Sequence, residues 1–277
     1  MAKLELKRYL TRHQTAAGPR WAVNGRALPD GFHLDLLLQR PLAAIEDALE
    51  YGATEEPVDG ALIAPIEDTQ EVWAAGVTYL RSRKARVTES STPDLYQRVY
   101  DAKRVEVFFK AIGWRVLGHG DAVRVRRDSK WNVPEPELTV LVNRAGEIVG
   151  YTAGNDVSSR DIEGQNPLYL PQAKIYDGAC ALGPGIVIAS ANGMRSLPIR
   201  MAIQRSGEVL FVGETSTAKL KRSLDEMVGW LTRELSFPEG VFLMTGTGLV
   251  PPDEFSLTAG DEVRIEVGDL ALENQVA

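Results

Sequence analysis

The sequence is almost devoid of cysteine. Its 277 residues contain one, Cys180, so an intramolecular disulfide is excluded and a zinc–thiolate centre is disfavoured. Small residues surround it in the stretch 178–182, which indicates packing. A single cysteine permits a reducing compartment.

Basic residues are also in deficit. The chain has 31 lysines and arginines against 38 aspartates and glutamates, a formal net charge of −7 with a pI near 5.2. Without a basic excess to neutralise phosphates, nucleic acid and anionic membrane surfaces are disfavoured as partners. An anionic substrate would have to be held locally, by a bound metal and a few basic side chains.

The chain also lacks a long hydrophobic run. No stretch approaches membrane-spanning length, and residues 1–7 alternate charged and apolar side chains, unlike the apolar core of a signal peptide. The hydrophobic content of 44% is enough to bury a full core. We therefore expect a cytoplasmic enzyme.

The first part of the chain reads as a small domain. A strand-like run at 21–23 is followed by a predicted helix that begins near Pro41 and ends near Gly52, with Leu42, Ile45 and Leu49 on one face. The polar, turn-rich stretch 55–60 marks a boundary region. We expect a small N-terminal α/β domain over residues 1–69 and a second domain over 70–277.

Strand patterns dominate the second domain. The candidates are 73–77, 123–125, 138–142, 148–152, 186–189, 201–204 and 263–267. Two helices interrupt them, one capped at 92–94 and one carrying apolar residues from Leu220 to Leu235 before Pro238. The expected fold class is α+β, with a β-rich C-terminal domain.

An acidic strand carries the clearest chemical signal. Glu135 and Glu137 are two residues apart, so in a strand they project from the same side. The turn 143–146 predicts a hairpin that carries Asp156 back towards them. Three carboxylates gathered in this way favour a hard cation with oxygen ligands. The alternative is an exposed edge strand, where flanking prolines blunt pairing and the glutamates are solvated.

These strings, in order, resemble the fumarylacetoacetate hydrolase superfamily. The resemblance rests on five segments, 134–138, 150–161, 173–174, 182–185 and 245–248, and extends from about Val72 to the C-terminus. Three further segments, 99–102, 106–111 and 164–176, are similar to the branch that contains 2-keto-3-deoxy-D-arabinonate dehydratase. The resemblance implies a catalytic domain of the mixed β-roll or barrel type.

The resemblance also implies roles for individual residues. Glu135, Glu137 and Asp156 would bind Mg²⁺, with Mn²⁺ or Ca²⁺ as substitutes, and no organic cofactor is expected. Lys174 aligns with the active-site lysine of the family; apolar neighbours and a nearby metal would favour its neutral form as a base. Thr247 matches the contact to the substrate carboxylate.

One departure from the hydrolases of the superfamily concerns catalysis. Those enzymes place a water-activating histidine in the loop after the first core strand, whereas residues 75–86 contain none. Arg81 and Ser82 could instead hold a polyhydroxylated acid. Glu106 is a candidate proton donor, with an ion pair to Arg104 or Lys103 as the alternative.

Three other charged residues have structural interpretations. Lys110 is a further catalytic candidate for which a structural ion pair is the default. Arg160 and Asp161 follow the acidic motif and are expected to pair structurally.

The resemblance leads to a functional expectation. The chain is predicted to be a metal-dependent hydro-lyase that dehydrates a 2-keto-3-deoxy sugar acid, such as 2-keto-3-deoxy-D-arabinonate, to 2,5-dioxopentanoate in pentose catabolism. The alternative is a C–C hydrolase or decarboxylase of a 2,4-diketo acid. The expected partners are a small anionic 2-keto acid and further copies of the chain, in a homodimer or higher homo-oligomer.

Overall fold

The described part of the protein contains two large β-sheets, one two-stranded sheet and several short helices. The computed structural model describes residues 8–81 and 93–277. The helices are α1 (Leu34–Leu37), α2 (Leu42–Gly52), α4 (Pro93–Asp101), α5 (Arg160–Gln165), α6 (Leu170–Lys174) and α7 (Leu224–Leu231). The strands are β1 (Tyr9–Thr15), β2 (Gly18–Val23), β3 (Arg26–Ala27), β4 (Ala61–Ile63), β5 (Glu71–Ala75), β6 (Val107–Ile112), β7 (Ala122–Val123), β8 (Asn132–Val133), β9 (Pro136–Val142), β10 (Ile148–Asp156), β11 (Ser158–Ser159), β12 (Cys180–Ile188), β13 (Pro198–Arg205), β14 (Glu208–Ser216), β15 (Val241–Met244), β16 (Asp261–Val267) and β17 (Leu270–Val276). The architecture is α+β, as expected.

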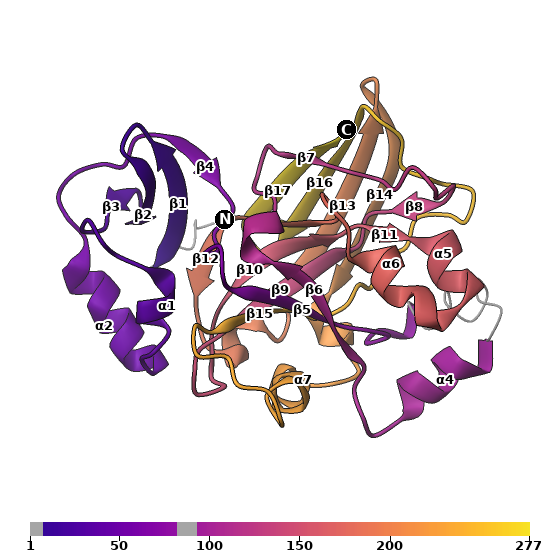
Figure 1. The fold of residues 1–277 in the computed structure, drawn as a ribbon, viewed down its shortest axis with the longest axis horizontal. Coiled ribbons are helices and arrows are strands. Elements are labelled where there is room, and N and C mark those ends of the chain that lie inside the picture. The colour runs from indigo at the N-terminus through magenta and orange to yellow at the C-terminus, as the bar shows by residue number, and fades with distance from the viewer. Residues whose placement is uncertain (1–7, 82–92) are drawn as a thin grey trace.

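The larger sheet contains strands from both the N-terminal region and the rest of the chain (Figure 1). Its strand order is β3-β2-β1-β12-β10-β9-β15-β5-β6, with β4 paired to β1. The late strand β15 inserts between β9 and β5, antiparallel to the first and parallel to the second. This insertion brings the segment after Met244 close to the acidic strand.

The hairpin of β9 and β10 is the centre of the sheet, and the sequence predicted it correctly. Every residue of both strands is buried, because the sheet is covered on both faces. The register pairs Gly154 with Glu137 and Asn155 with Pro136. Beyond the last pair, the Asp156 amide donates to the Glu135 carbonyl at 3.0 Å. The hairpin therefore delivers Asp156 next to Glu135.

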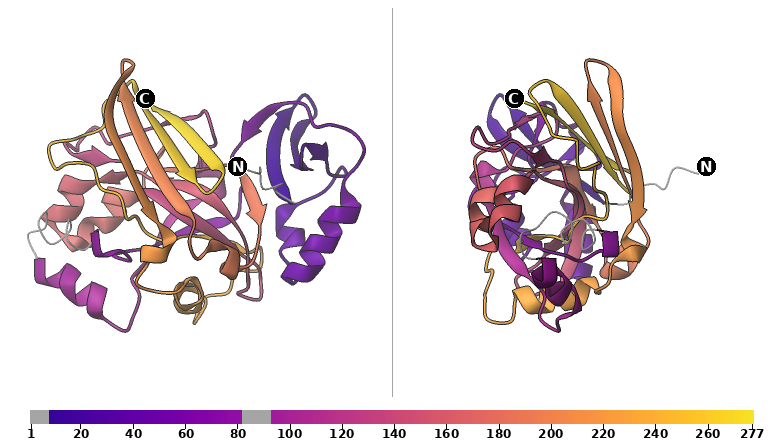
Figure 2. Two further views of the ribbon diagram at one scale, coloured as in Figure 1. Left: turned by 180° about the vertical axis from the view of Figure 1, so that it is seen from behind. Right: turned by 90° about the vertical axis from the view of Figure 1, so that its right-hand side faces the viewer.

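The second sheet packs on the first and closes the main core. Its order is β14-β13-β16-β17-β7, and Figure 2 shows its long orange and yellow strands from behind. Alternate residues of β13 and β16, such as Met201 and Ile265, meet Leu138 and Val140 of β9 in one hydrophobic cluster. This alternation is the period-2 pattern of half-buried strands.

The N-terminal region packs at the other end of the large sheet. Helix α2 begins after Pro41 and ends at Gly52, in agreement with the sequence. Strand β1 pairs with β12 through Tyr9 and Leu10, so the sheet continues from the N-terminal region into the rest of the chain (Figures 1 and 2).

The predicted helix over 220–235 was too long. Helix α7 begins at Leu224, because the Ser223 hydroxyl caps it by accepting from the Glu226 amide at 3.1 Å. Leu220 instead forms a β-bridge with Tyr79, and Leu235 lies beyond the helix with 44% of its surface exposed. The apolar spacing therefore extends beyond the helix at both ends: Leu220 belongs to a β-bridge, and Leu235 is a partly exposed residue after the helix.

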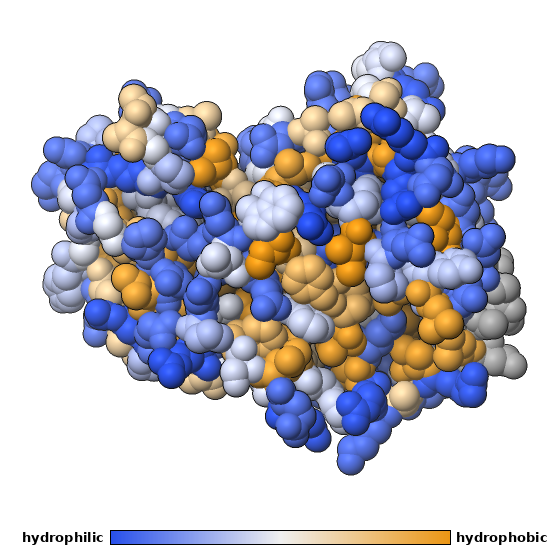
Figure 3. Space-filling model, in the orientation of Figure 1, coloured by the Kyte–Doolittle hydropathy of each residue, from blue (hydrophilic) through white to orange (hydrophobic). Residues whose placement is uncertain are grey.

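The surface is uneven in hydropathy. In Figure 3, hydrophobic residues gather over the middle of the face drawn in Figure 1, while the N-terminal region is mainly hydrophilic. Part of the apolar surface belongs to the edge strand β6, where Val107, Phe109 and Ile112 are only partly buried. Within residues 8–81 and 93–277, no helix has the length and apolar character required to cross a lipid bilayer.

Candidate functional site

Three buried carboxylates meet where β9 and β10 converge. Glu135, Glu137 and Asp156 each offer an oxygen, and these oxygens lie within 4.8 Å of one another. Their side chains are almost fully enclosed, since the residues are 3%, 2% and 1% exposed. The edge-strand alternative, in which the glutamates are solvated, is therefore wrong. Buried like charges this close require cations around them.

Lys174 supplies one of these cations. It is the last residue of α6, and its Nζ donates to Glu135 Oε2 at 2.7 Å, Asp156 Oδ2 at 2.9 Å and Ser158 Oγ at 2.6 Å. The ammonium also lies 5.8 Å from the centre of the Phe108 ring. The lysine expected to act as a base thus sits against two of the three carboxylates.

Lys110 approaches Asp156 from the other side. It projects from β6 with its Nζ 2.5 Å from Asp156 Oδ1, and it donates to the carbonyl oxygens of Lys174 at 2.6 Å and Val157 at 3.1 Å. Its side chain is fully buried. The default interpretation of Lys110 as a member of an ion pair is confirmed, and the pair lies within the site.

Arg160 neutralises Glu135. It opens α5, is 1% exposed, and its guanidinium binds Glu135 Oε1 at 2.8 Å. Asp161 has other partners, since its carboxylate accepts from the Ser129 hydroxyl and the Lys130 amide. Arg160 and Asp161 were expected to pair with each other, but each binds different partners. Adjacent residues on a helix point in different directions, which keeps the two side chains apart.

Glu137 is held by a backbone amide from the late segment after β15. The Gly246 amide donates to Glu137 Oε2 at 2.6 Å, and Gly246 has a φ of +88° with a Cβ position that would collide with Thr78. Only glycine suits this position. Burial raises the pKa of the Glu137 carboxyl well above its usual range, and the charges of Asp156 and Glu135 act in the same direction.

A cavity opens beside the carboxylates. Besides the three carboxylates it is lined by Ala75, Gly76, Val77, Glu106, Phe108, Glu163, Leu170, Lys174, Gly246 and Thr247. Glu106 approaches so closely to Gly76 that a Cβ there would overlap its carboxylate. The Thr247 hydroxyl, donated to the Leu249 carbonyl at 3.0 Å, is buried at the same place.

The structure thus brings most of the predicted site residues together. Arg104, one alternative partner of Glu106, stacks 4.7 Å over the Trp230 ring. Arg81 is exposed and does not line the cavity described here. Ser82 lies outside the described residues.

The loop after β5 is strained where it meets the cavity. Val77 adopts a φ of +53°, a left-handed conformation that a β-branched residue rarely takes and that concentrates at functional sites.

All three histidines of the sequence fall in the described segments. His13 and His33 lie in the N-terminal region, and the His119 ring accepts from the Glu273 amide at 3.2 Å. None of them lines the cavity.

The charge of the site fits a divalent cation. Five carboxylates line the cavity, and three cationic side chains contact them from the described part of the chain: Glu106, Glu135, Glu137, Asp156 and Glu163 against Lys110, Arg160 and Lys174. A divalent ion bound by the buried carboxylates would offset their mutual repulsion. An all-oxygen donor set selects a hard ion such as Mg²⁺, Mn²⁺ or Ca²⁺.

Sequence reasoning missed one buried acid. Glu163 lines the cavity from α5 and is 4% exposed. The available signal was its position three residues after Arg160, which places both on one helix face. Ser158, which accepts from Lys174, carried no distinguishing pattern.

Comparison with known proteins agrees with this geometry. Residues 71–277 match the model of the fumarylacetoacetate (FAA) hydrolase C-terminal family. A relative from Haloferax volcanii, named "Probable 2-keto-3-deoxyxylonate dehydratase", is 52% identical over 211 residues, which is 76% of this chain and 72% of the relative. The 2-dehydro-3-deoxy-D-arabinonate dehydratase of Saccharolobus solfataricus is 44% identical over 208 residues, 73% of this chain and 70% of that protein.

A solved structure extends the likeness to the whole fold. The structure of 2-keto-3-deoxy-D-arabinonate dehydratase complexed with magnesium and 2,5-dioxopentanoate superposes with a TM-score of 0.81 at 34% identity, covering 97% of this chain and 98% of that one. The matched family region begins at β5 and includes every residue of the carboxylate cluster. The chain therefore belongs to the fumarylacetoacetate hydrolase family.

Proposed function

We propose that the protein is a hydro-lyase that removes water from a 2-keto-3-deoxypentonate and forms 2,5-dioxopentanoate. The observation that carries the proposal is one cavity that holds an amine, a separate acid and a cation-binding carboxylate cluster: Lys174, Glu106 and the cluster around Asp156. The names of the two relatives at 52% and 44% identity support the same reaction.

The carboxylate cluster is proposed to hold Mg²⁺. The ligands would be Glu135, Glu137 and Asp156, and Mn²⁺ or Ca²⁺ could substitute. When bound, the ion supplies positive charge for the C1 carboxylate and C2 oxygen of the substrate, and so favours the enolate that develops on removal of a C3 proton. The magnesium complex of the structural relative supports this choice of ion.

Lys174 is proposed to remove the C3 proton. Its Nζ is held on one side of the cavity by Glu135, Asp156 and Ser158. To act as a base the ammonium must first lose a proton, and a cation bound by the same carboxylates would favour that loss. Glu106, on the lining beside Gly76, would protonate the C4 hydroxyl as it leaves as water. Transfer of a C5 proton then converts the product into the aldehyde.

The substrate is proposed to be held at both ends. Thr247 would contact the C1 carboxylate, because the residue lines the cavity next to Gly246, whose amide binds Glu137. Arg81 and Ser82 would contact the distal hydroxyls. This assignment agrees with the small anionic keto acid expected as the partner.

The test is a substrate screen with purified protein. We expect 2-keto-3-deoxypentonates to yield 2,5-dioxopentanoate with no release of pyruvate, and EDTA to abolish turnover until Mg²⁺ is restored. Both products are followed by NMR. Efficient hydrolysis of an acylpyruvate, with no dehydration of any 2-keto-3-deoxypentonate, would instead identify a C–C hydrolase.

Three further expectations accompany the proposed reaction. The protein is predicted to act in the cytoplasm in sugar-acid catabolism, and to form a homodimer or higher homo-oligomer, which light scattering of the purified protein can measure. The division into residues 1–69 and 70–277 stays a prediction about domain organisation.

A further inference from the structure

The cavity contains one more acid than the first step of the proposed reaction uses. Its titratable lining residues are Glu106, Glu135, Glu137, Asp156, Glu163 and Lys174. Three of them form the carboxylate cluster, and Lys174 and Glu106 act at C3 and at the C4 hydroxyl. Glu163 is left without a role.

The placement of Glu163 indicates that the acid faces the reacting molecule. It lies on α5 one turn after Arg160, on the same face of the helix, and the two residues are 4% and 1% exposed. Arg160 turns towards Glu135, whereas Glu163 lines the cavity together with Leu170 and Lys174. Glu163 is therefore a buried acid on the wall of the cavity that would hold the substrate.

The proposed reaction has a second stage, in which a proton moves from C5 to C4. Loss of water across C3 and C4 leaves a double bond between these atoms, with C5 still a hydroxymethyl group. The aldehyde forms only after a C5 proton is removed, and conjugation with the C2 ketone acidifies that proton. Lys174 by then carries the C3 proton, Glu106 is a carboxylate that must regain a proton, and Glu163 is the acid of the cavity with no step assigned.

We propose that Glu163 is a catalytic residue that moves a proton from C5 to C4, an inference that rests on the proposed function. As Glu163 takes the C5 proton, the C5–H electron pair forms the C4–C5 double bond, the C3–C4 π pair shifts to C2–C3, and the C2–O π pair moves to the oxygen to give a dienolate. Lys174 then returns its proton to C3. Glu163 gives its proton to C4 while the C5 hydroxyl proton passes to Glu106, so that all three groups regain their starting states.

The test compares Glu163→Gln with the unaltered protein on two substrates. With a 2-keto-3-deoxypentonate we expect the variant to keep releasing water, to accumulate 5-hydroxy-2-oxopent-3-enoate, and to form 2,5-dioxopentanoate about 10²-fold more slowly. With 4-hydroxy-2-oxopentanoate, which lacks the C5 hydroxyl and stops at the enone, we expect equal rates. NMR time courses follow each species.

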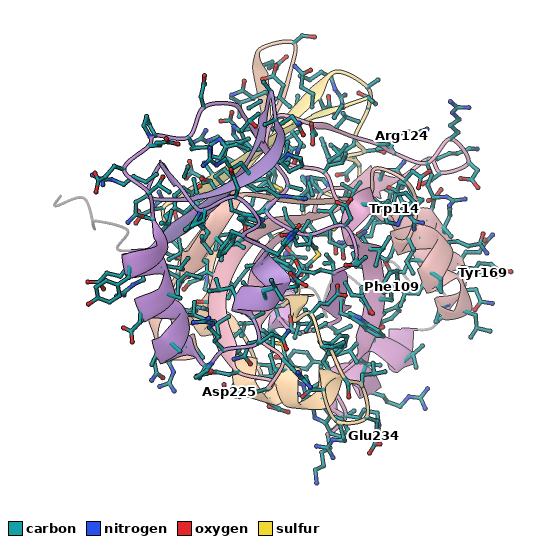
Figure 4. All side chains as sticks on the ribbon, turned by 60° about the vertical axis from the view of Figure 1, so that its left-hand side comes forward. Phe109, Trp114, Arg124, Tyr169, Asp225 and Glu234 are labelled. Carbon is teal, nitrogen blue, oxygen red and sulfur yellow. The ribbon has the colours of Figure 1, made fainter. Side chains whose placement is uncertain are left out.

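A matched control is Glu234→Gln, because Glu234 is exposed and lies at the surface in Figure 4. Formation of 2,5-dioxopentanoate by Glu163→Gln at the rate of this control overturns the inference, as does equal slowing on both substrates, which would place Glu163 in the first step. If the unaltered protein dehydrates neither substrate, the proposed function itself fails.

A second measurement does not depend on the variant folding. A substrate carrying deuterium at C5 is converted by the unaltered protein in a single turnover. One C5 deuterium stays in the aldehyde. If the deuterium removed from C5 is found at C4 of the product, it supports transfer by one carboxyl group, and if that deuterium passes wholly to solvent the inference is overturned.

Discussion

At the scale of single residues, Asp156 has two connected tasks. Its Oδ2 accepts from Lys174 and its Oδ1 lies beside Lys110, while it also belongs to the carboxylate cluster. Lys110 in turn binds the carbonyl oxygen of Lys174. The proposed base and the proposed metal ligand are thus held by the same buried cation.

Replacing Lys174 by Met should remove proton transfer at C3, with some loss of stability because Glu135 and Asp156 lose a buried cation. The methionine stem preserves much of the packing but has no amine. We expect the rate of deuterium exchange into the methyl group of pyruvate to fall by about 10²- to 10⁴-fold, as measured by NMR. The matched control is Lys130→Met at an exposed position. Exchange at the normal rate would assign the base to another residue.

Replacing Lys110 by Met should chiefly reduce stability. The change leaves Asp156 Oδ1 without its buried ammonium, and loss of one partner of a buried pair costs about 3–5 kcal/mol. Chemical denaturation would measure the loss, again with Lys130→Met for comparison. Adding Asp156→Asn should recover part of the loss, and a double variant no more stable than Lys110→Met alone would contradict the pairing.

At the scale of elements, the sequence predicted local geometry better than contacts between distant segments. The hairpin of β9 and β10 follows from alternating apolar residues around a turn, so both partners of Asp156 in the cluster were predictable. The place of β15 beside β9 was not, because β15 is a short apolar run whose partners lie about a hundred residues away. The resemblance placed segment 245–248 in the site, but no local pattern predicted the contact between the Gly246 amide and Glu137.

The same distinction applies to the helices near the site. The spacing of Arg160 and Glu163 predicts that they share one face of a helix. It does not predict which residues that face contacts, because α5 is only six residues long and its contacts depend on how it packs against the rest of the protein. Tyr169 follows on the connection to α6 and is 39% exposed, pointing outward in Figure 4. Whether a residue on such a short element is buried depends on tertiary packing and not on the local sequence.

The loop after β5 offers a test of the position of Glu106. A Cβ at residue 76 would overlap the Glu106 carboxylate, which lies at the end of a flexible side chain. We therefore expect Gly76→Ala to displace that carboxylate and lower turnover about tenfold or more, with little change in thermal stability. Gly229→Ala is the control, because nothing lies within 4 Å of its Cβ position. Unchanged turnover in Gly76→Ala would argue against Glu106 as the proton donor.

At the scale of the whole molecule, the carboxylate cluster makes stability depend on pH. The pKa of Glu137 is raised by folding above its ordinary value of 4.5, so the folded protein binds more protons than the unfolded chain in the interval between the two values. Stability from this group is complete below about pH 4.5 and is lost as the pH rises through the folded pKa.

We therefore expect added Mg²⁺ to raise the melting temperature of EDTA-treated protein more at pH 8 than at pH 5. Ligands bind the ion when deprotonated, and an ion that binds only the folded state stabilises it. Differential scanning calorimetry at both pH values measures the effect. An equal or larger effect at pH 5 would contradict the proposed ligand set.

The hydrophobic core beneath the large sheet joins the N-terminal region to the catalytic part. One cluster combines Leu10 and Trp21 with Leu182, Phe242 and Met244, and β1 lies against β12. Residues 8–69 are thus part of the scaffold that supports the site. An evolving or engineered protein could not exchange this segment as a free module, because a replacement would have to reproduce one half of a shared interior.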